Sequence, residues 1–122
     1  MRPTLAMNRF SRQQRLLKGV QFDRVFKRNV RSRDQFFVVL ASLNQLPYPR
    51  LGLAISRKAA GDAVPRNRLK RLVRESFRTL PDDYPGLDFI VMAKAGAAAQ
   101  PNDILLKSLT KHWNRVQAQC AK

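Results

Sequence analysis

The chain has 122 residues, of which 24 are Lys or Arg and 8 are Asp or Glu, so its formal net charge is +16. A hydrophobic content of 44% excludes an intrinsically disordered chain, because such chains combine high charge with far fewer apolar residues. A single cysteine, Cys120, excludes an internal disulfide and with it a secreted cystine scaffold. We therefore predict one compact domain with a polyanionic partner, for which nucleic acid is the leading candidate.

The positive charge lies in two segments. Residues 1–33 hold ten basic residues and one acidic residue, and residues 57–78 hold eight basic and two acidic residues, so these segments account for +15 of the net charge. A uniformly solvated surface would not be so uneven. We expect residues 1–18 to form either a basic arm that becomes ordered on RNA or a tail without contacts, and residues 19–122 to form the domain.

The first half of that domain is predicted to contain a short helix and two strands. Phe22, Val25 and Phe26 have the spacing of an amphipathic helix over 20–26, which ends near Asn29. The apolar run at 35–43 predicts a strand, and the alternation at 51–56 predicts a second strand, antiparallel to the first.

The second half is predicted to form two helices around a buried strand. A helix begins near Pro65 and ends near Leu80. The nearly continuous apolar run at 87–93 is typical of a strand in a parallel βαβ unit, and Asn102 is predicted to cap the start of a last helix. The predicted order is α, β, β, α, β, α, a single α+β domain with a small mixed sheet. The residues predicted to face its core from the two helices are Leu69, Leu72, Val73, Phe77, Leu80, Leu105, Leu109, Trp113 and Val116.

The helix over 65–80 has a basic side opposite its apolar side. Guanidinium groups can bind phosphate oxygens in pairs, and cations one helical turn apart can follow a nucleic-acid backbone. A solvated surface helix would balance such cations with acidic residues four positions away, but residues 66–78 hold six basic residues against one acidic residue. Arg68 and Glu75 lie at the edge of this side. Its other members are Arg66, Asn67, Lys70, Arg71, Arg74 and Arg78.

This helix also carries a recognisable motif. The sequence AVPRNRLKRLVRESFR at 63–78 resembles the signature helix of the protein component of bacterial ribonuclease P. Further matching segments follow the same order over roughly residues 9–117. They are RLL at 15–17, FDRVFKR at 22–28, PRLGLAISRK at 49–58 and LDFIVMAK at 87–94.

The resemblance implies the fold of the second domain of ribosomal protein S5. Its βαβ crossover would be left-handed, whereas nearly all such crossovers are right-handed. It implies a subunit of an endoribonuclease in which a large RNA is the catalyst and removes the 5′ leader of precursor tRNA. The implied partners are the catalytic RNA, one per protein, and precursor tRNA, with no membrane. Magnesium would be held by RNA and none by the protein alone, and the implied setting is the bacterial cytoplasm.

The resemblance also suggests roles for particular residues. Ser56, Arg57 and Lys58 match a segment beside the leader cleft. Phe22 and Phe26 match aromatic residues that stack on unpaired leader bases, a role we also consider for Phe36. A strand position across the cleft that is often aromatic is Val39 or Leu40 here. The residues that match the contact with the catalytic RNA are Arg66, Asn67, Arg68, Lys70, Arg71 and Arg74.

Two other interpretations of the sequence remain. A structural RNA-binding protein, such as a ribosomal protein, would have the same size, charge and basic helix, but no reason to combine the 63–78 motif with Phe22 and Phe26. A duplex-DNA reader is disfavoured because the basic helix offers only Asn67 and Glu75 to read bases beyond its cations. We expect no catalytic residue in the protein, since His112 has no obvious carboxylate or nucleophilic partner in the sequence.

Overall fold

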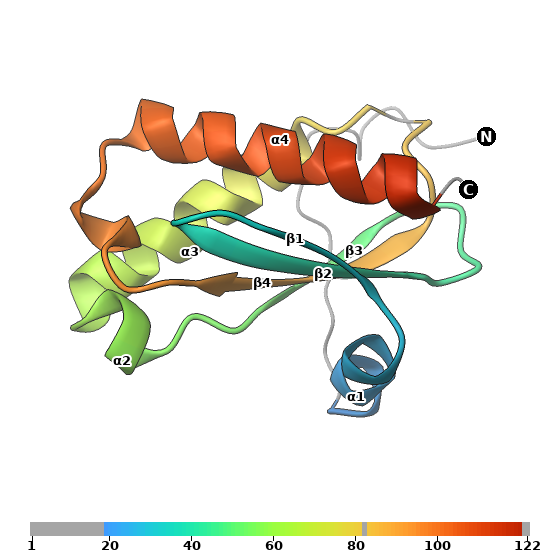
Figure 1. Ribbon diagram of the computed structural model, residues 1–122, viewed down its shortest axis with the longest axis horizontal. Helices are drawn as coiled ribbons and strands as arrows, with labels where there is room; N and C mark the ends of the chain where they lie inside the picture. Colours follow the sequence, from blue (N-terminus) through green and yellow to red (C-terminus); the bar gives the residue numbers. More distant parts are fainter. Residues whose placement is uncertain (1–18, 82, 121–122) are drawn as a thin grey trace.

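Four strands and four α-helices make up the part of the chain that the computed structural model describes, residues 19–81 and 83–120 (Figure 1). The predicted arm at 1–18 lies outside the described residues. The predicted order of the six main elements is confirmed, and the additional elements are short. In chain order the elements are α1 (Gly19–Lys27), β1 (Val30–Arg33), β2 (Phe37–Leu43), β3 (Arg50–Leu53), α2 (Arg57–Ala60), α3 (Ala63–Arg78), β4 (Leu87–Ala93), the 3-10 helix η3 (Ala97–Ala99) and α4 (Asn102–Cys120).

The strands form one mixed sheet in the order β1-β2-β4-β3. β4 runs antiparallel to β2 and parallel to β3, with Phe89 opposite both Ala41 and Leu51. The predicted antiparallel pairing of the 51–56 strand with the 35–43 strand is therefore wrong, because β4 lies between them. β4 has the longest run of consecutive buried residues among these strands, and a central position pairs both of its edges and covers both of its faces.

Helices α3 and α4 cover one face of the sheet and bury the main core (Figure 1). The core side chains predicted on both helices are buried, except that Leu80 is only half-buried. Two large polar side chains in this core are paired: Tyr84 Oη donates to the carbonyl oxygen of Trp113, and Trp113 Nε1 donates to Ser76 Oγ. Pairing of this kind removes most of the cost of burying polar groups.

Helix α1 is the helix that lies against the opposite face, and it covers only part of it (Figure 1). Val25, Leu40 and Ile90 form a small buried cluster there. The side chain of Asn29 ends the helix by donating Nδ2–H bonds to the carbonyl oxygens of Val25 and Phe26, at 2.7 and 3.2 Å. The predicted end of this helix near Asn29 is confirmed.

An ion pair fastens β3 to β4 on the same face as α1. Arg50 and Asp88 are opposite each other in the parallel register, and the guanidinium donates from Nε and Nη2 to the two carboxylate oxygens at 2.7 and 2.6 Å. Asn44 Nδ2 donates to the same carboxylate at 2.9 Å. This pairing raises the pKa of Arg50, chiefly through its hydrogen bonds to Asp88. Arg50 therefore stabilises the sheet and is not offered to a partner.

Candidate RNA interface

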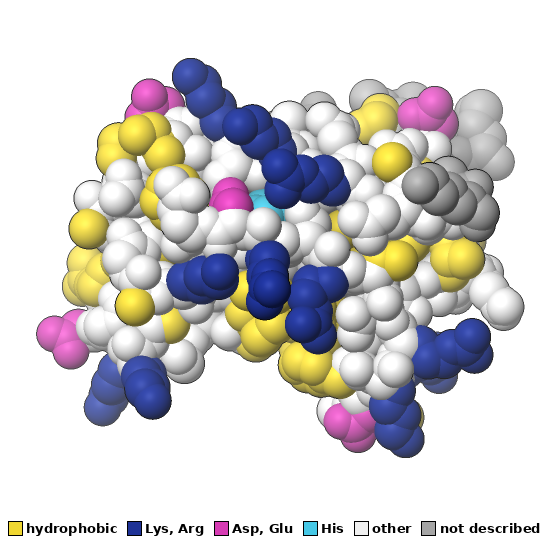
Figure 2. Space-filling model, viewed as in Figure 1, with side chains coloured by type: hydrophobic (Ala, Val, Ile, Leu, Met, Phe, Trp, Pro, Cys, Tyr) yellow, Lys and Arg dark blue, Asp and Glu magenta, His cyan; other side chains and the backbone are white. Residues whose placement is uncertain are grey.

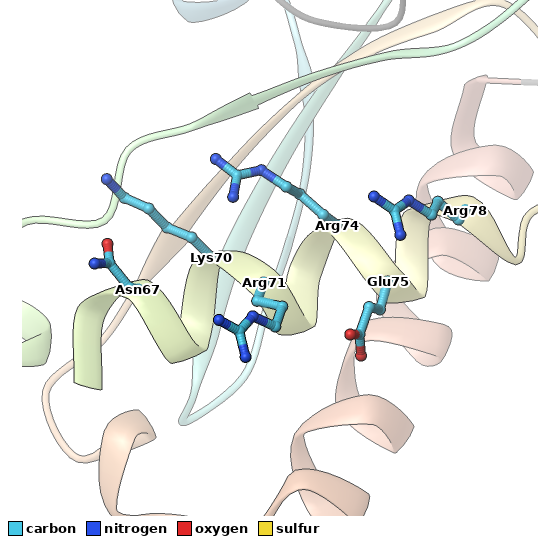
Figure 3. Close-up of a pocket in the computed structure, with 6 residues that line it drawn as sticks. All are labelled: Asn67, Lys70, Arg71, Arg74, Glu75 and Arg78. Atoms are coloured by element: carbon cyan, nitrogen blue, oxygen red, sulfur yellow. The ribbon is translucent and has the colours of Figure 1, made fainter. Parts of the chain in front are cut away.

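The outer side of α3 presents a shallow, positively charged groove (Figure 3). Pro65 lies in the first turn, where its missing N–H costs nothing, and the buried apolar side of the helix directs the basic side outward. Asn67 and Arg71 are exposed, and Lys70 and Arg74 are half-buried. Glu75 is the one acidic residue in the lining. The lining residues are Asn67, Lys70, Arg71, Arg74, Glu75 and Arg78.

Arg68 does not belong to this groove, although the motif places it among the RNA-binding residues. Its Nη1 donates to the carbonyl oxygen of Ala98 at 2.9 Å, its Nη2 to that of Gln100 at 2.5 Å, and its Nε and Nη2 both donate to Asn102 Oδ1. The guanidinium thus joins α3 to the segment that leads into α4. It also occupies the side-chain oxygen of Asn102, which we expected to cap α4.

Arg66 occupies an intermediate position. It is half-buried, its backbone N–H donates to the carbonyl oxygen of Asp62, and its Nε is buried with no hydrogen-bond partner among the described residues. Arg66 does not line the groove of α3. The structure therefore brings together four of the six residues that the motif assigns to the catalytic RNA, namely Asn67, Lys70, Arg71 and Arg74.

The two aromatic residues of α1 differ in their surroundings. Phe22 is half-buried against the cluster of Val25, Leu40 and Ile90, whereas the Phe26 side chain is 49% exposed. Leu40 faces α1 and Val39 faces the main core, so Leu40 is the strand residue across from these rings. The sheet beside Phe22 is apolar, with Val38 and Met92 half-buried.

Strand β1 adds two cations to this face that we did not identify from the sequence. Arg31 and Arg33 are exposed and lie opposite Leu40 and Val38, so their side chains are on the face that α1 partly covers. Their strand has four residues, alternates apolar or small residues with arginines, and sits at the sheet edge. The alternation of Val30, Arg31, Ser32 and Arg33 is the signal that indicates it.

The remaining residues predicted to contact the leader lie elsewhere. Ser56 caps α2 by accepting a hydrogen bond from the Ala59 N–H at 3.1 Å, and Arg57 and Lys58 are exposed on that helix. In Figure 1, α2 and α1 lie at opposite ends of the sheet. Phe36 is half-buried and packs against the main core, so it does not join the apolar surface around Phe22.

His112 has partners that are distant in sequence. Ser32 Oγ and His112 Nδ1 are 2.6 Å apart, and His112 Nε2 lies 3.3 Å from Asp34 Oδ2. Burial is the largest effect on the pKa of His112 and lowers it, while the nearby Asp34 acts in the opposite direction. Burial alone would raise the pKa of Asp34, but hydrogen bonds from Ser108 and two backbone N–H groups lower it to about 2. His112 is 0% and Ser32 4% exposed, so no substrate reaches this Ser-His-Asp arrangement and it acts in packing.

These features define a class: a basic α+β domain with a four-stranded mixed sheet and an arginine-rich helix on its surface. No helix among the described residues is long and apolar enough to cross a membrane. The sequence model of the ribonuclease P family matches residues 10–117 of the chain.

Known proteins with similar sequences and structures are also ribonuclease P proteins. The chain is 46% identical over 112 residues to the ribonuclease P protein component of Methylococcus capsulatus, covering 92% of this chain and 88% of that protein. It is 43% identical to that of Nitrosococcus oceani, covering 92% and 94%. Solved structures of the RNase P proteins of Staphylococcus aureus, in a mutant form, and Thermotoga maritima superpose with TM-scores of 0.80 and 0.71, at 27% and 30% identity. They cover 93% and 85% of this chain, and 96% of each of those chains.

The chain belongs to the ribonuclease P protein family. It is a protein component of ribonuclease P, a subunit for tRNA 5′ processing that acts with the ribonuclease P RNA.

Proposed function

We propose that this protein binds the catalytic RNA of ribonuclease P through the groove of α3 and the 5′ leader of precursor tRNA through the sheet face beside α1. The RNA would carry the catalytic site and cleave the leader, and the protein would increase the affinity for substrate. The observation that carries the proposal is the separation of a cationic groove from an apolar, partly uncovered sheet face within one domain.

The groove of α3 suits the backbone of a folded RNA. Its cations are spaced by about one helical turn, roughly 5 Å, so several can contact successive phosphates. The scaffold holds this helix firmly, because Leu69, Leu72, Val73 and Phe77 are buried and Arg68 ties it to α4. A rigid cationic helix loses little conformational freedom on binding.

The face beside α1 suits an unpaired strand. The exposed ring of Phe26 and the partly buried ring of Phe22 offer surfaces for bases, and base stacking tolerates any leader sequence. Arg31 and Arg33 lie beside the apolar side chains of this sheet face, where they can neutralise backbone phosphates.

Magnesium enters this proposal only through RNA. It prefers carboxylate, carbonyl and water oxygens and usually keeps substrate phosphates among its ligands. The side chains that line the groove are cations and an amide apart from Glu75, and on the face of α1 the Asp88 carboxylate is already engaged by Arg50 and Asn44. We propose the cytoplasm, where precursor tRNA is made, as the setting.

The first test is cleavage of a precursor tRNA by a bacterial ribonuclease P RNA at low magnesium, with and without this protein. We expect the protein to stimulate cleavage only when the RNA is present, with no cleavage by protein alone. Tight RNA binding without stimulation would contradict the proposal and favour a structural RNA-binding protein.

A pair of groove variants tests the α3 contact. Arg71→Gln should weaken binding to the catalytic RNA and reduce the slope of log K against log salt by about 1, the change expected for one lost phosphate contact. Glu75→Gln changes the charge of the same groove in the opposite direction and should strengthen binding. Equal effects of both variants would exclude a phosphate contact at this groove.

The leader contact has a matched control on the same helix. Phe26→Ala should reduce the preference for substrates with a leader, while Val20→Ala, which also removes an exposed apolar side chain, should leave it unchanged. Identical preferences in both variants would assign the leader to another surface.

A further inference from the structure

Helix α4 carries a row of cations on its outer surface, far from the groove of α3. Lys107, Lys111 and Arg115 are exposed and four residues apart, so they share one side of the helix at intervals of about 6 Å. We name these three residues the α4 row. No proposed contact described above uses it.

The α4 row lies beside the cations of β1 because a buried hydrogen bond joins their elements. Ser32, which lies between Arg31 and Arg33, pairs with His112, which follows Lys111. Figure 2 shows the result as two rows of basic side chains on one face of the molecule, one along α4 and one over the strands below it.

The electrostatics of His112 agree with this arrangement. Burial has the largest effect in lowering its pKa, and the charges of Arg115 and Lys94 lower it further, so cations from α4 and from the end of β4 both act on this site. The neighbouring Asp34 raises that pKa but is engaged by Ser108 and by the N–H groups of Phe36 and Phe37. Because Asp34 raises this pKa by more than Arg115 and Lys94 lower it, the positive charge of the face comes from its exposed cations, those of the α4 row together with Arg31 and Arg33.

The order of the strands indicates what this face meets. β3, which leads into α2 and α3, is one edge of the sheet and β1 is the other. Adjacent strands are about 4.8 Å apart, so a leader that crosses the open face from the β3 edge reaches Arg31 and Arg33 at the β1 edge after a few nucleotides. Helix α4, which packs against β1 at that edge, carries the α4 row.

We propose that the α4 row binds the distal part of a long 5′ leader of precursor tRNA, after the leader has passed Arg31 and Arg33 at the β1 edge. This inference rests on the proposed leader site and extends it around the edge of the sheet. The occupant is an unpaired RNA strand held mainly by its phosphates, so the contact is independent of leader sequence and weakened by salt.

The test compares leaders of about 4 and about 16 nucleotides, the range of lengths that single-strand-binding folds cover. The holoenzyme with the wild-type protein should bind the long-leader substrate more tightly than the short-leader substrate. The triple variant Lys107→Gln, Lys111→Gln, Arg115→Gln should lose this gain, by several-fold at low salt, and bind the short-leader substrate as before. Glutamine keeps the helix propensity of these positions close to that of lysine and arginine.

A second triple variant controls for the loss of net charge. Arg24→Gln, Lys27→Gln, Arg28→Gln removes three exposed cations at the end of α1 and should change the affinity for both substrates by the same factor. If the α4 variant also weakens both substrates equally, or leaves the long-leader gain intact, the inference is wrong. If it weakens the binding of the catalytic RNA alone beyond the α1 control, the row contacts that RNA instead and the inference is again wrong.

A crosslinking experiment locates the contact directly. A photoreactive group on Lys111→Cys, in a Cys120→Ser background, should crosslink to nucleotides far from the cleavage site in the long leader. Crosslinks confined to the tRNA body or the catalytic RNA would overturn the inference. Wild-type stimulation of short-leader cleavage tests the proposed function separately, so failure of one does not imply failure of the other.

Discussion

The two faces of the sheet are built for different purposes. The face under α3 and α4 buries a large continuous core that includes Phe37, Phe89 and Trp113, and the polar atoms of Tyr84 and Trp113 in it are paired within the protein. The face beside α1 buries a cluster of only three apolar residues and leaves Phe22, Val38 and Met92 half-buried. Most of the folding free energy therefore comes from one face, which allows the other to keep apolar surface and cations available for RNA.

The largest loss of stability is expected when a large side chain is removed from the main core. Phe89 is fully buried and packs against Trp113, Tyr84 and Phe77, so Phe89→Ala should lower the free energy of unfolding by about 3–5 kcal/mol. Urea denaturation measures this change. A loss below about 1 kcal/mol would mean that this face does not dominate stability.

The next largest effect separates cations that hold the fold from cations that are offered to RNA. Arg68→Ala leaves the carbonyl oxygens of Ala98 and Gln100 without their donor and should cost about 1–3 kcal/mol of unfolding free energy. Arg71→Ala, on the exposed side of the same helix, should leave stability nearly unchanged and weaken RNA binding. If the Arg68→Ala protein had normal stability but weak RNA binding, Arg68 would belong with the residues that contact RNA.

The buried contact between α4 and β1 should show as a dependence of stability on pH. Because the pKa of His112 is lower in the folded protein, the unfolded chain binds more protons below about pH 6.5, and stability falls as pH falls, by at most about 1.4 kcal/mol per pH unit. His112→Gln cannot titrate and should flatten the slope between pH 7 and 5. Equal slopes in both proteins would show that His112 does not cause it.

Asp34 should add a second decline at lower pH. Its pKa is about 2 when folded against 3.8 for the model compound, so its stabilising contribution is complete above about pH 4 and is lost as pH falls toward 2. Asp34→Asn should reduce the decline in that range only, as measured by thermal unfolding across pH. An undiminished decline there would assign it to other carboxylates.

The smallest effect on stability is expected on the face beside α1. Phe22→Ala removes a half-buried ring and should cost about 1 kcal/mol or less, a fraction of the cost for a buried phenylalanine, while it reduces the preference for substrates with a leader. A loss of stability comparable to that of Phe89→Ala, with leader preference kept, would place Phe22 in the core and not in the binding surface.

The strongly periodic elements were predictable from the sequence. The helical stripe through Leu69, Val73 and Phe77 and the apolar run of β4 are long patterns, and both elements form where predicted. Strand β1 was not predicted, because four residues with one large apolar side chain give little signal. The neighbours of each strand depend on which strand needs both edges paired, and the spacing of apolar residues does not contain that information.

For the candidate site, the sequence predicts which residues are charged but not what they contact. Arg68 and Arg71 are equivalent in the motif, yet one bonds to carbonyl oxygens some thirty residues away and the other faces solvent. The pairing of His112 with Ser32 spans eighty residues and likewise depends on the fold. Long-range contacts decide in both cases whether a polar side chain supports the structure or remains free to bind.

The position of β4 also sets when this protein can fold during synthesis. Its central strand comes from residues 87–93, so β2 and β3 have no common neighbour until the last third of the chain has been made. The basic helix α3 leaves the ribosome before the strand that supports it, and α4 follows later still. Folding should therefore be nearly all-or-none at the end of translation, and C-terminal truncations within α4 should leave nascent chains sensitive to proteases.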